Sequence, residues 1–412
     1  MGKRIPWQPH RGRRQERRLQ TPPRWRGRMK RWVVPAIVAV TAAMLFTGCG
    51  EGRATADATS AEYRIGIVFD LGGRGDMAQN DLAYEGLVLV AQEFGGFIAN
   101  DPEAVNFGDL VELRYVEPQA GGQDREQLLR SFGEDGFDLV FGVGFAFTDA
   151  VDRIAQDFPD THFALIDAVV PDLGADRNVT GVSFAEHEGS FLVGALAGIL
   201  TRNTDARVGF IGGMDIPLIH TFHGGFAAGA MYTNAALRAG GMVLAQYIGQ
   251  DPTAFHDPQS AERIALEMYD QGAHSVFHAA GSSGSGLFQA AYDRGRWAIG
   301  TDFDQALGYA VADTALERAI GERIITSMLK RVDRAVFLLS SDLINGEGRL
   351  EGGSISLGLE DGGVGVAVNE FNRENIEPHI EELETLRTRI IAGEIIVPDS
   401  PTGIAEWAEV TF

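Results

Sequence analysis

Three aspartates of this sequence stand directly after short apolar runs, where their side chains are placed to bind a small molecule. They are Asp70, Asp167 and Asp302. In a doubly wound parallel sheet, ligands meet the loops at the carboxyl ends of the strands. Carboxylates in those loops repel phosphate but accept hydrogen bonds from hydroxyls and ring N–H groups. The sequence therefore favours a neutral ligand, a polyol or a base, over a phosphorylated one.

The glycine-rich loops lack the spacing of phosphate-binding motifs. From Gly73, the dinucleotide pattern G-x-G-x-x-G fails at Ala78. From Gly281, the P-loop spacing reaches Gly286 but then meets Leu287 where lysine is required. The sequence also contains no G-x-S-x-G nucleophile elbow. We therefore expect neither a nucleotide-phosphate site nor an enzyme.

Two further patterns carry little weight. His220 and His223 are spaced i, i+3, which places two imidazoles on one helical face, but no third metal ligand follows at a recognisable spacing. We expect these histidines at the surface or at the rim of a cleft, with no metal and no cofactor. Arg74-Gly75-Asp76 spells an adhesion tripeptide, but three residues recur by chance.

The pattern of strands and helices expected between these loops predicts an α/β protein. The chain has 412 residues, 45% of them hydrophobic and 22% charged, which suits two globular domains. Apolar runs separated by helical patterns predict parallel sheets covered on both faces. We predict strands at 65–69, 110–116, 139–143, 163–166, 208–211, 275–277, 297–300 and 355–358. We predict helices around 87–94 and 148–158, the second capped by Thr148, and one long helix over 314–343.

Charge is distributed unevenly along the chain. Residues 1–48 hold twelve Lys and Arg residues against one acid, Glu16, while the whole chain has a formal net charge of -22. The part after residue 48 is therefore even more acidic than the total. Such a surface repels phosphate backbones and anionic lipid, so we expect no nucleic-acid partner.

The N-terminal region has the features of an export signal. Met29-Lys30-Arg31 precedes an apolar stretch over 32–46, which suits a signal-peptide h-region and is short for a membrane span. We therefore predict a signal peptide over 1–48. A signal peptide that begins at Met29 has ordinary length, so residues 1–28 are consistent with a start codon assigned too early.

Small residues directly before the one cysteine, in Phe46-Thr47-Gly48-Cys49, resemble a bacterial lipobox, with Phe46 at the usual leucine position. The resemblance implies that Cys49 carries lipid and begins the mature protein; the alternative is a buried structural cysteine. Residues 49–62 are small and polar, which suits a tether. We expect a cell-membrane lipoprotein on the extracytoplasmic side, in contact with the membrane through its lipid only.

Eight blocks of sequence follow one another over essentially the whole mature chain. Three of them are "DLGGRGD" at 70–76, which continues to 86, "EGSFLVGALAG" at 188–198 and "TSMLKR" at 326–331. The others lie at 157–170, 208–229, 279–286, 298–305 and 357–366. Together they resemble the basic membrane protein family. The resemblance implies a PnrA-like lipoprotein that serves as the substrate-binding component of an ABC importer, typically for purine nucleosides.

The resemblance implies a type I periplasmic binding protein fold, with two Rossmann-like lobes, three crossovers and a ligand cleft between the lobes. The implied N-terminal lobe is 63–182 plus 305–340, and the C-terminal lobe is 183–304 plus 341–396, followed by a tail at 397–412. The implied partners are a purine nucleoside of the guanosine, inosine or adenosine type and an ABC permease. We expect a monomer.

The family pattern D-x-G-x-x-x-D-x-S-F-N matches Asp70, Asp76 and Asn80, and the resemblance gives these residues contacts to the sugar or the base. It also implies that Asp167 and Asp302 accept hydrogen bonds from ribose or purine N–H groups. The alternative for the aspartates is that each caps the helix that follows it.

Lys330 matches the family's cleft lysine, and Phe222 matches one of two rings that sandwich the base. The second ring of the family is Gln79 here. Stacking on a base contributes on the order of 1–3 kcal/mol, so its loss should weaken binding or shift its preference. Phe145, after Gly144, is a candidate for the second face. We expect Gln79 itself to face the ligand, because a glutamine amide can lie flat on a purine or bond its edge.

Gly281 and Ser282, in the loop 279–286, are candidates for a close backbone approach to the ligand; the alternative is a flexible turn. Phe222 has the alternative of a plain core residue, and Lys330 that of a solvated helix face.

Three other functions are alternatives to this one. A protein of the same fold could receive another small polar ligand, such as a sugar or a furanose signal. A nucleoside-cleaving enzyme would need a nucleophile or a metal set, which the sequence lacks. A lipoprotein that displays or signals without transport would lack permease and ATPase genes beside its own.

Overall fold

Two predominantly parallel sheets organise the chain, and their strands end in loops that carry the predicted aspartates. The computed structural model describes residues 61–411 apart from 77, 169, 171 and 172, all within one compact unit. The predicted signal peptide, Cys49 and most of the tether lie outside the described residues. The first sheet has the strand order β12-β6-β5-β4-β1-β3-β2, and the second has the order β13-β11-β10-β9-β7-β8.

The strands of the first sheet are β1 (Tyr63–Val68), β2 (Gly96–Ile98), β3 (Val111–Val116), β4 (Leu139–Val143), β5 (His162–Ile166), β6 (Val179–Phe184) and β12 (Gly353–Leu357). Those of the second are β7 (Arg207–Met214), β8 (Val243–Gly249), β9 (Ala273–Ala279), β10 (Trp297–Asp302), β11 (Ile324–Lys330) and β13 (Val364–Val366). The pairing is parallel throughout except between β11 and β13.

The α-helices are α1 (Gln79–Phe94), α2 (Arg125–Glu134), α3 (Thr148–Asp157), α4 (Glu186–Leu200), α5 (Pro217–Thr233), α6 (Pro258–Asp270), α7 (Gly284–Arg294), α8 (Gln305–Ala310), α9 (Ala315–Gly321), α10 (Val332–Asn345), α11 (Arg373–Ile376), α12 (Ile380–Ile391) and α13 (Ile404–Thr411). Short 3₁₀ turns are η1 (Ala120–Gly122), η2 (Phe145–Phe147), η3 (Ala235–Arg238), η4 (Pro252–Phe255), η5 (Gly281–Ser283), η6 (Glu377–His379) and η7 (Pro401–Gly403). Among the described residues, every helix is too short or too polar to cross a bilayer.

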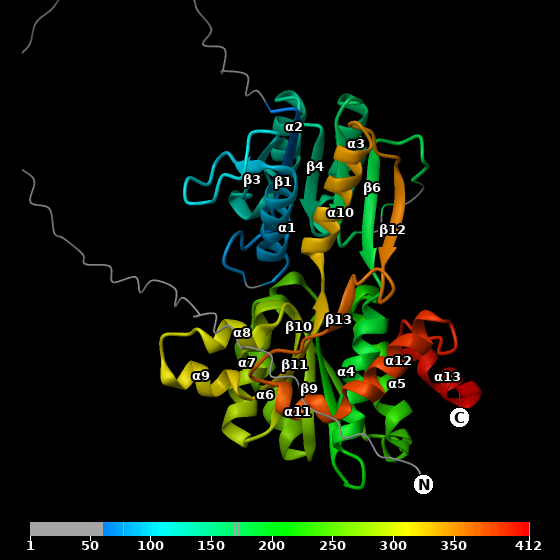
Figure 1. The fold of residues 1–412 in the computed structure, drawn as a ribbon. Helices are drawn as coiled ribbons and strands as arrows, with labels where there is room; N and C mark the ends of the chain where they lie inside the picture. The colour runs from blue at the N-terminus through cyan, green and yellow to red at the C-terminus, as the bar shows by residue number, and fades with distance from the viewer. Residues whose placement is uncertain (1–60, 77, 169, 171–172, 412) are drawn as a thin grey trace, which may run out of the picture. The chain divides into compact units, whose positions relative to one another are not determined.

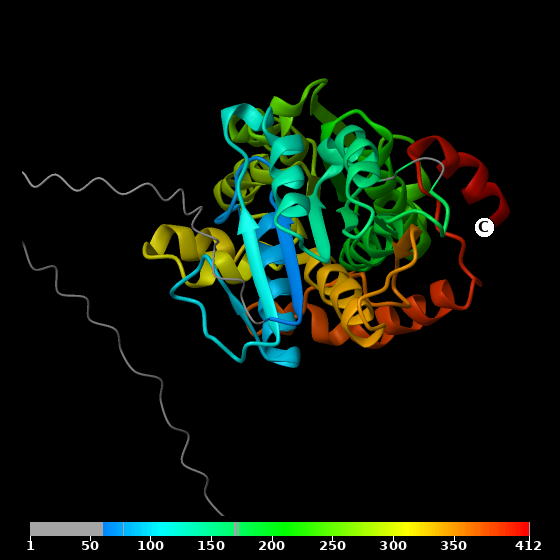
Figure 2. The same cartoon turned by 90° about the horizontal axis from the view of Figure 1, so that it is seen from above.

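Both faces of the first sheet are buried under helices, as its apolar strands require. Alternate residues of a strand point to opposite faces, so Ile65 and Ile67 pack in the core beside α1 and α10, while Val68 packs in the core beside α2 and α3. The neighbouring helices α1 and α10 lie far apart in sequence (Figure 1). In Figure 2, β1 lies between β3 and β4. The prediction of parallel sheets with helical cover is confirmed.

The chain passes between the sheets three times. It leaves the first sheet after β6, returns after β11 through α10 to β12, and leaves again after β12 for β13. The three expected crossovers are therefore present. The expected lobe segments 305–340 and 341–396 are wrong in part, because β11 belongs to the second sheet and β12 to the first. The expected tail contains α13, which packs on α5.

The predicted long helix over 314–343 is also wrong. The structure has α9, β11 and α10 in its place. The run Ile324–Lys330 is short and almost continuously apolar, and periodicity alone does not separate such a strand from a buried helix. A second difference is Thr148, whose hydroxyl donates to the carbonyl of Phe145 rather than capping α3.

Helices α4 and α5 pack unusually closely through glycines, and both helices carry residues of the candidate site. A Cβ added to Gly229 would lie 2.0 Å from the carbonyl oxygen of Phe191, and one added to Gly194 would lie 2.1 Å from that of Phe226. Each helix therefore needs glycine where the other helix's backbone crosses it.

We predict that Gly229→Ala lowers the free energy of unfolding by about 1–3 kcal/mol, because the new methyl group overlaps the backbone of α4 and forces the helices apart. Denaturant unfolding measures the loss. Gly240→Ala is the matched control, since a Cβ there meets no heavy atom within 4 Å. Equal stability of the two variants would contradict the packing argument.

Candidate functional site

A cavity of about 330 Å³ lies between loops of the two sheets. The first sheet contributes the loop between β1 and α1, including Asp76. The second sheet contributes Asp302 at the end of β10 and the turn with Gly281 and Ser282. We call it the inter-sheet cavity. Its lining residues are Gly72, Gly75, Asp76, Ala78, His256, Gly281, Ser282, Ser285, Phe288, Thr301, Asp302, Phe303, Gln305 and Tyr309.

Asp302 is the most unusual carboxylate in the cavity. It has a left-handed backbone, with φ of 64°, and its Oδ1 is buried with no hydrogen-bond partner in the described part of the chain. Burial raises its pKa to about 6, and the charges of Asp167 and Asp76 add to this, while Lys330 opposes it. A buried acceptor without a donor costs free energy. Asp302 also lines the cavity, so its carboxylate is a candidate acceptor for a hydrogen bond from a bound molecule.

Asp76 both lines the cavity and organises helix α1. Its carboxylate accepts hydrogen bonds from the backbone N–H groups of Ala78, Asn80 and Asp81 at 2.9–3.2 Å. Asp76 thus accepts from N–H groups in the first turn of α1, as a capping residue does, and it also lines the cavity wall. Burial raises its pKa, and the three N–H groups work against that rise.

Lys330 joins loops from both sheets. Its buried Nζ lies 2.5 Å from Asp167 Oδ1 and 3.1 Å from Glu186 Oε1. Asp167 follows β5 of the first sheet, and Glu186 opens α4 directly after the first crossover. Burial alone would lower the pKa of Lys330, but Asp167, Glu186 and Asp302 outweigh it and raise that pKa. Lys330 ends a strand, so the reading of it as a solvated helix face is wrong.

Glu186 is a site residue that the sequence did not reveal. It is buried, and burial raises its pKa against the pull of Lys330. Because β6 was not predicted, the residues after it were not examined as a loop at a strand's carboxyl end. One lysine therefore serves two direct carboxylate partners and lies within electrostatic range of a third, Asp302.

Asp70 belongs to a separate cluster rather than to the cavity wall. Its Oδ1 accepts a hydrogen bond from Arg125 Nη2 at 2.5 Å. Asn80 is buried and its Oδ1 accepts from the backbone N–H of Asp70, which holds the loop against α1. Gly144, with φ of 100°, leaves room for Asp70, because a Cβ there would lie 3.0 Å from Asp70 Oδ2 and 3.5 Å from Gln79 Nε2.

The two phenylalanines expected at the base lie outside the inter-sheet cavity wall. Phe222, on α5, is buried, and its ring centre lies 5.7 Å from Lys330 Nζ. Phe145 is half exposed in η2 after β4. The aromatic rings that do line the cavity are Phe288, Phe303 and Tyr309, none of which the sequence indicated.

The turn at Gly281 and Ser282 lines the inter-sheet cavity. Gly281 has a positive φ of 54°, and a Cβ there would lie 3.2 Å from the carbonyl oxygen of Phe255. The hydroxyl of Ser282 donates to that same carbonyl at 2.9 Å and pairs with His256 Nδ1 at 3.0 Å. The turn is therefore held by its own hydrogen bonds.

The remaining sequence patterns have structural explanations. His220 pairs with Asp215, and His223 pairs with the hydroxyl of Tyr247. Within the described residues, no group of three or more potential ligands could hold a metal ion. The guanidinium of Arg74 stacks on the ring of Tyr84 at 3.4 Å and bonds Asp81, so the tripeptide at 74–76 is fixed within its own loop.

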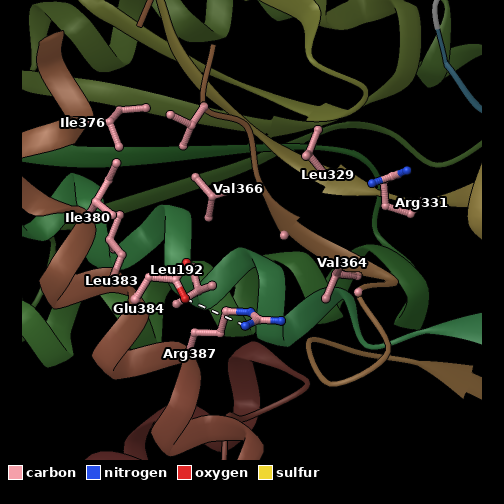
Figure 3. Close-up of a pocket in the computed structure, with 13 residues that line it drawn as sticks. Leu192, Leu329, Arg331, Val364, Val366, Ile376, Ile380, Leu383, Glu384 and Arg387 are labelled. Carbon is pink, nitrogen blue, oxygen red and sulfur yellow. Dashed lines mark ion pairs between the residues drawn. The ribbon is translucent and has the colours of Figure 1, made fainter. Parts of the chain in front are cut away.

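A second cavity, of about 380 Å³, lies beside β13 and α12 (Figure 3). Its wall is mainly apolar, with Val364 and Val366 facing side chains of α11 and α12. Its Arg387 lies 3.8 Å from Glu384 and donates to the carbonyl of Leu359. None of the predicted site residues lines this cavity, and its charged groups have protein partners.

Comparison with known proteins agrees with this architecture. A family model described as "ABC transporter substrate-binding protein PnrA-like" matches residues 64–401. The ABC transporter nucleoside-binding protein BmpA of Lactococcus lactis is 27% identical over 90% of this chain and 99% of its own length. An uncharacterized lipoprotein of Pyrococcus furiosus is 30% identical over 80% of this chain and 75% of its own.

Among solved structures, an ABC transporter solute-binding protein from Aeropyrum pernix has a TM-score of 0.64 at 28% identity. The match covers 84% of this chain and 96% of the other. The predicted periplasmic binding protein fold is confirmed. The family match spans both sheets and every loop of the inter-sheet cavity. The chain therefore belongs to the PnrA-like family of ABC transporter substrate-binding proteins.

Proposed function

We propose that the protein is a lipid-anchored component of an ABC importer that captures a purine nucleoside and delivers it to a membrane permease. The observation that carries this proposal is Asp302, which lines a cavity built from both sheets and whose buried Oδ1 has no hydrogen-bond partner among the described residues. A carboxylate in that state needs a hydrogen-bond donor, and sugar hydroxyls and purine N–H groups are such donors.

The electrostatics of the cavity favour an uncharged ligand. Asp76 and Asp302 both line it, and Lys330, the nearest cation in the cluster, is already paired with Asp167 and Glu186. A phosphate group would meet carboxylates without a free cation, at a large desolvation cost. The aromatic rings in the wall offer apolar surface to a flat base. A nucleoside therefore fits this chemistry better than a nucleotide.

Closure around the ligand follows from the two-sheet construction. A ligand that contacts Asp76 on one side and Asp302 on the other stabilises conformations in which the two loops stay close. The three crossovers are the segments about which such a motion would hinge. A lipid on Cys49 would hold the protein beside its permease and raise the effective concentration there.

A second candidate is a receptor of the same fold for a sugar-like ligand. Gln79 in place of an aromatic residue and the position of Phe222 off the cavity wall favour this alternative, because they leave the family's base sandwich without its two rings at the inter-sheet cavity. The acceptors Asp76 and Asp302 would serve a free sugar as well as a ribose.

We predict that small molecules released from the denatured, freshly purified protein include a purine nucleoside, detected by mass spectrometry. Calorimetric titration of the emptied protein with guanosine, inosine, adenosine and ribose should give a clear binding isotherm for at least one nucleoside and a weaker one for ribose. Inosine incubated with the protein should be recovered without free base. Tight binding of ribose with no binding of nucleosides would instead support the sugar receptor.

We predict that Asp302→Asn weakens nucleoside binding by at least about tenfold, because a charge-assisted hydrogen bond is lost, and raises the Tm of the ligand-free protein, because a buried unpaired charge is removed. Asp313→Asn, on the exposed turn between α8 and α9, is the control and should change neither quantity.

The same variant tests a pH dependence. A ligand that donates to Asp302 requires the ionised form, so a proton competes with it. With the pKa of Asp302 at about 6, affinity should be constant well above pH 6 and fall as pH drops through this value. Titrations between pH 5 and 8 should show this fall in the wild type and lose that component in Asp302→Asn. An identical profile in both proteins would exclude Asp302 as the ligand's acceptor.

We predict that Cys49→Ala releases the exported protein from the membrane. After detergent phase separation of cells labelled with palmitate, the wild type should enter the detergent phase with its label, and the variant should stay in the aqueous phase unlabelled. Ser60→Ala, within the same tether, should behave as the wild type. Label on the Cys49→Ala variant would disprove this anchor site.

A further inference from the structure

The side-chain amide of Gln305 has a fixed orientation at the wall of the inter-sheet cavity. Gln305 is the first residue of α8, and its Oε1 lies 2.9 Å from the backbone nitrogen of Thr301 and 2.9 Å from Nε2 of His278. A backbone N–H only donates, so the atom that faces it must be the amide oxygen. The amide nitrogen of Gln305 is thereby placed on the other side.

The ring of His278 reinforces this orientation. The amide oxygen carries no hydrogen, so Nε2 of His278 must donate, and its Nδ1 is left buried without a partner in the described part of the chain. Burial lowers the pKa of His278 to about 4, which keeps the ring neutral. The ring packs edge-on against Phe288 and leaves no room for a Cβ on Gly284, which would approach within 2.2 Å.

The amide nitrogen of Gln305 is a hydrogen-bond donor, whereas the carboxylates that line the same cavity are acceptors. Gln305 lines the cavity. Within the described residues, its Nε2 donates to no acceptor. This nitrogen is also not one of the fully buried side-chain atoms that lack a hydrogen-bond partner. Asp302 directly follows Thr301, to which the amide is pinned. The wall therefore holds an oriented donor and, three residues earlier in the chain, the carboxylate of Asp302. A hydroxyl group can serve both at once, because it donates one hydrogen and accepts through its lone pairs.

We propose that Gln305 is a specificity-determining residue whose Nε2 donates to a sugar hydroxyl of the bound ligand while that hydroxyl donates to Asp302. This inference rests on the proposed nucleoside function and deepens it. Gln305 thereby recognises the hydroxylated part of the ligand, and His278 is the positioning residue that fixes the amide of Gln305.

The decisive variant is Gln305→Glu, because it retains Oε1 for Thr301 and His278 and changes only the atom that faces the cavity, from a donor to an acceptor. Calorimetry at pH 8 compares wild type and variant for the nucleoside that binds best and for its 2′-, 3′- and 5′-deoxy analogues. The parent nucleoside should bind the variant at least about tenfold more weakly, and the analogue that lacks the contacted hydroxyl should bind both proteins within about threefold of each other.

An equal loss for the parent and all three analogues would assign the effect to added charge and overturn the proposal, as would the absence of any loss. If the wild type binds no nucleoside at all, the proposed function itself fails, and the two failures are distinct. Histidine ¹H–¹⁵N spectra of the ligand-free wild type provide an independent check: His278 should carry its proton on Nε2. A proton on Nδ1 would overturn the assigned amide orientation.

Discussion

The buried ammonium of Lys330 is the interaction on which the arrangement of the site depends. An ammonium removed from water costs several kcal/mol unless opposite charges surround it, and here the compensation comes from Asp167 and Glu186. These two carboxylates belong to the first sheet and to the helix after the first crossover, whereas Lys330 ends a strand of the second sheet. The charge therefore ties three separate parts of the chain to one point. Lys330 also attracts Asp302, but burial and the like charges of Asp167 and Asp76 outweigh this attraction and keep the pKa of Asp302 raised.

A left-handed backbone conformation sets the direction of two aspartate side chains. Asp167 and Asp302 both have positive φ, 61° and 64°, and each stands at the carboxyl end of a strand, one in each sheet. Aspartate tolerates the left-handed region better than most residues, but the conformation still costs energy and persists only where the surroundings enforce it. The same local turn thus directs a carboxylate out of each sheet, which brings acceptors from both sheets to one cluster. Strain of this kind gathers at functional sites.

Much of this fold was predictable from the sequence, because its strands are buried on both faces and read as apolar runs. The predicted strands match β1, β3, β4, β5, β7, β9, β10 and β12 closely. Three of the five missed strands, β8, β6 and β11, were missed for physical reasons. β8 is half exposed and lacks a continuous apolar run, and β6 is interrupted by a glycine and polar residues. β11 has a length and composition that suit either a strand or a buried helix.

The candidate site was predictable only in part. Asp76, Asp302 and the turn at Gly281 stand at strand ends, where position along the chain is enough to suggest a ligand loop. Arg125, Glu186 and Gln305 gave no such signal, because their roles depend on which distant side chain each one meets. The ligand roles expected for Asp70, Gln79, Phe145 and Phe222 stay predictions, and none of these four lines the inter-sheet cavity.

The interleaved path of the chain has a consequence for its biosynthesis. β6 obtains its outer neighbour only from β12, and β11 obtains its own only from β13. While the chain is being made or exported from its N-terminus, β6 and β11 remain edge strands until residues 353–366 arrive. Open edges invite pairing with other chains. A nascent molecule that stalls before β12 thus exposes β6 and β11 as edge strands, which β12 and β13 cover in the folded protein.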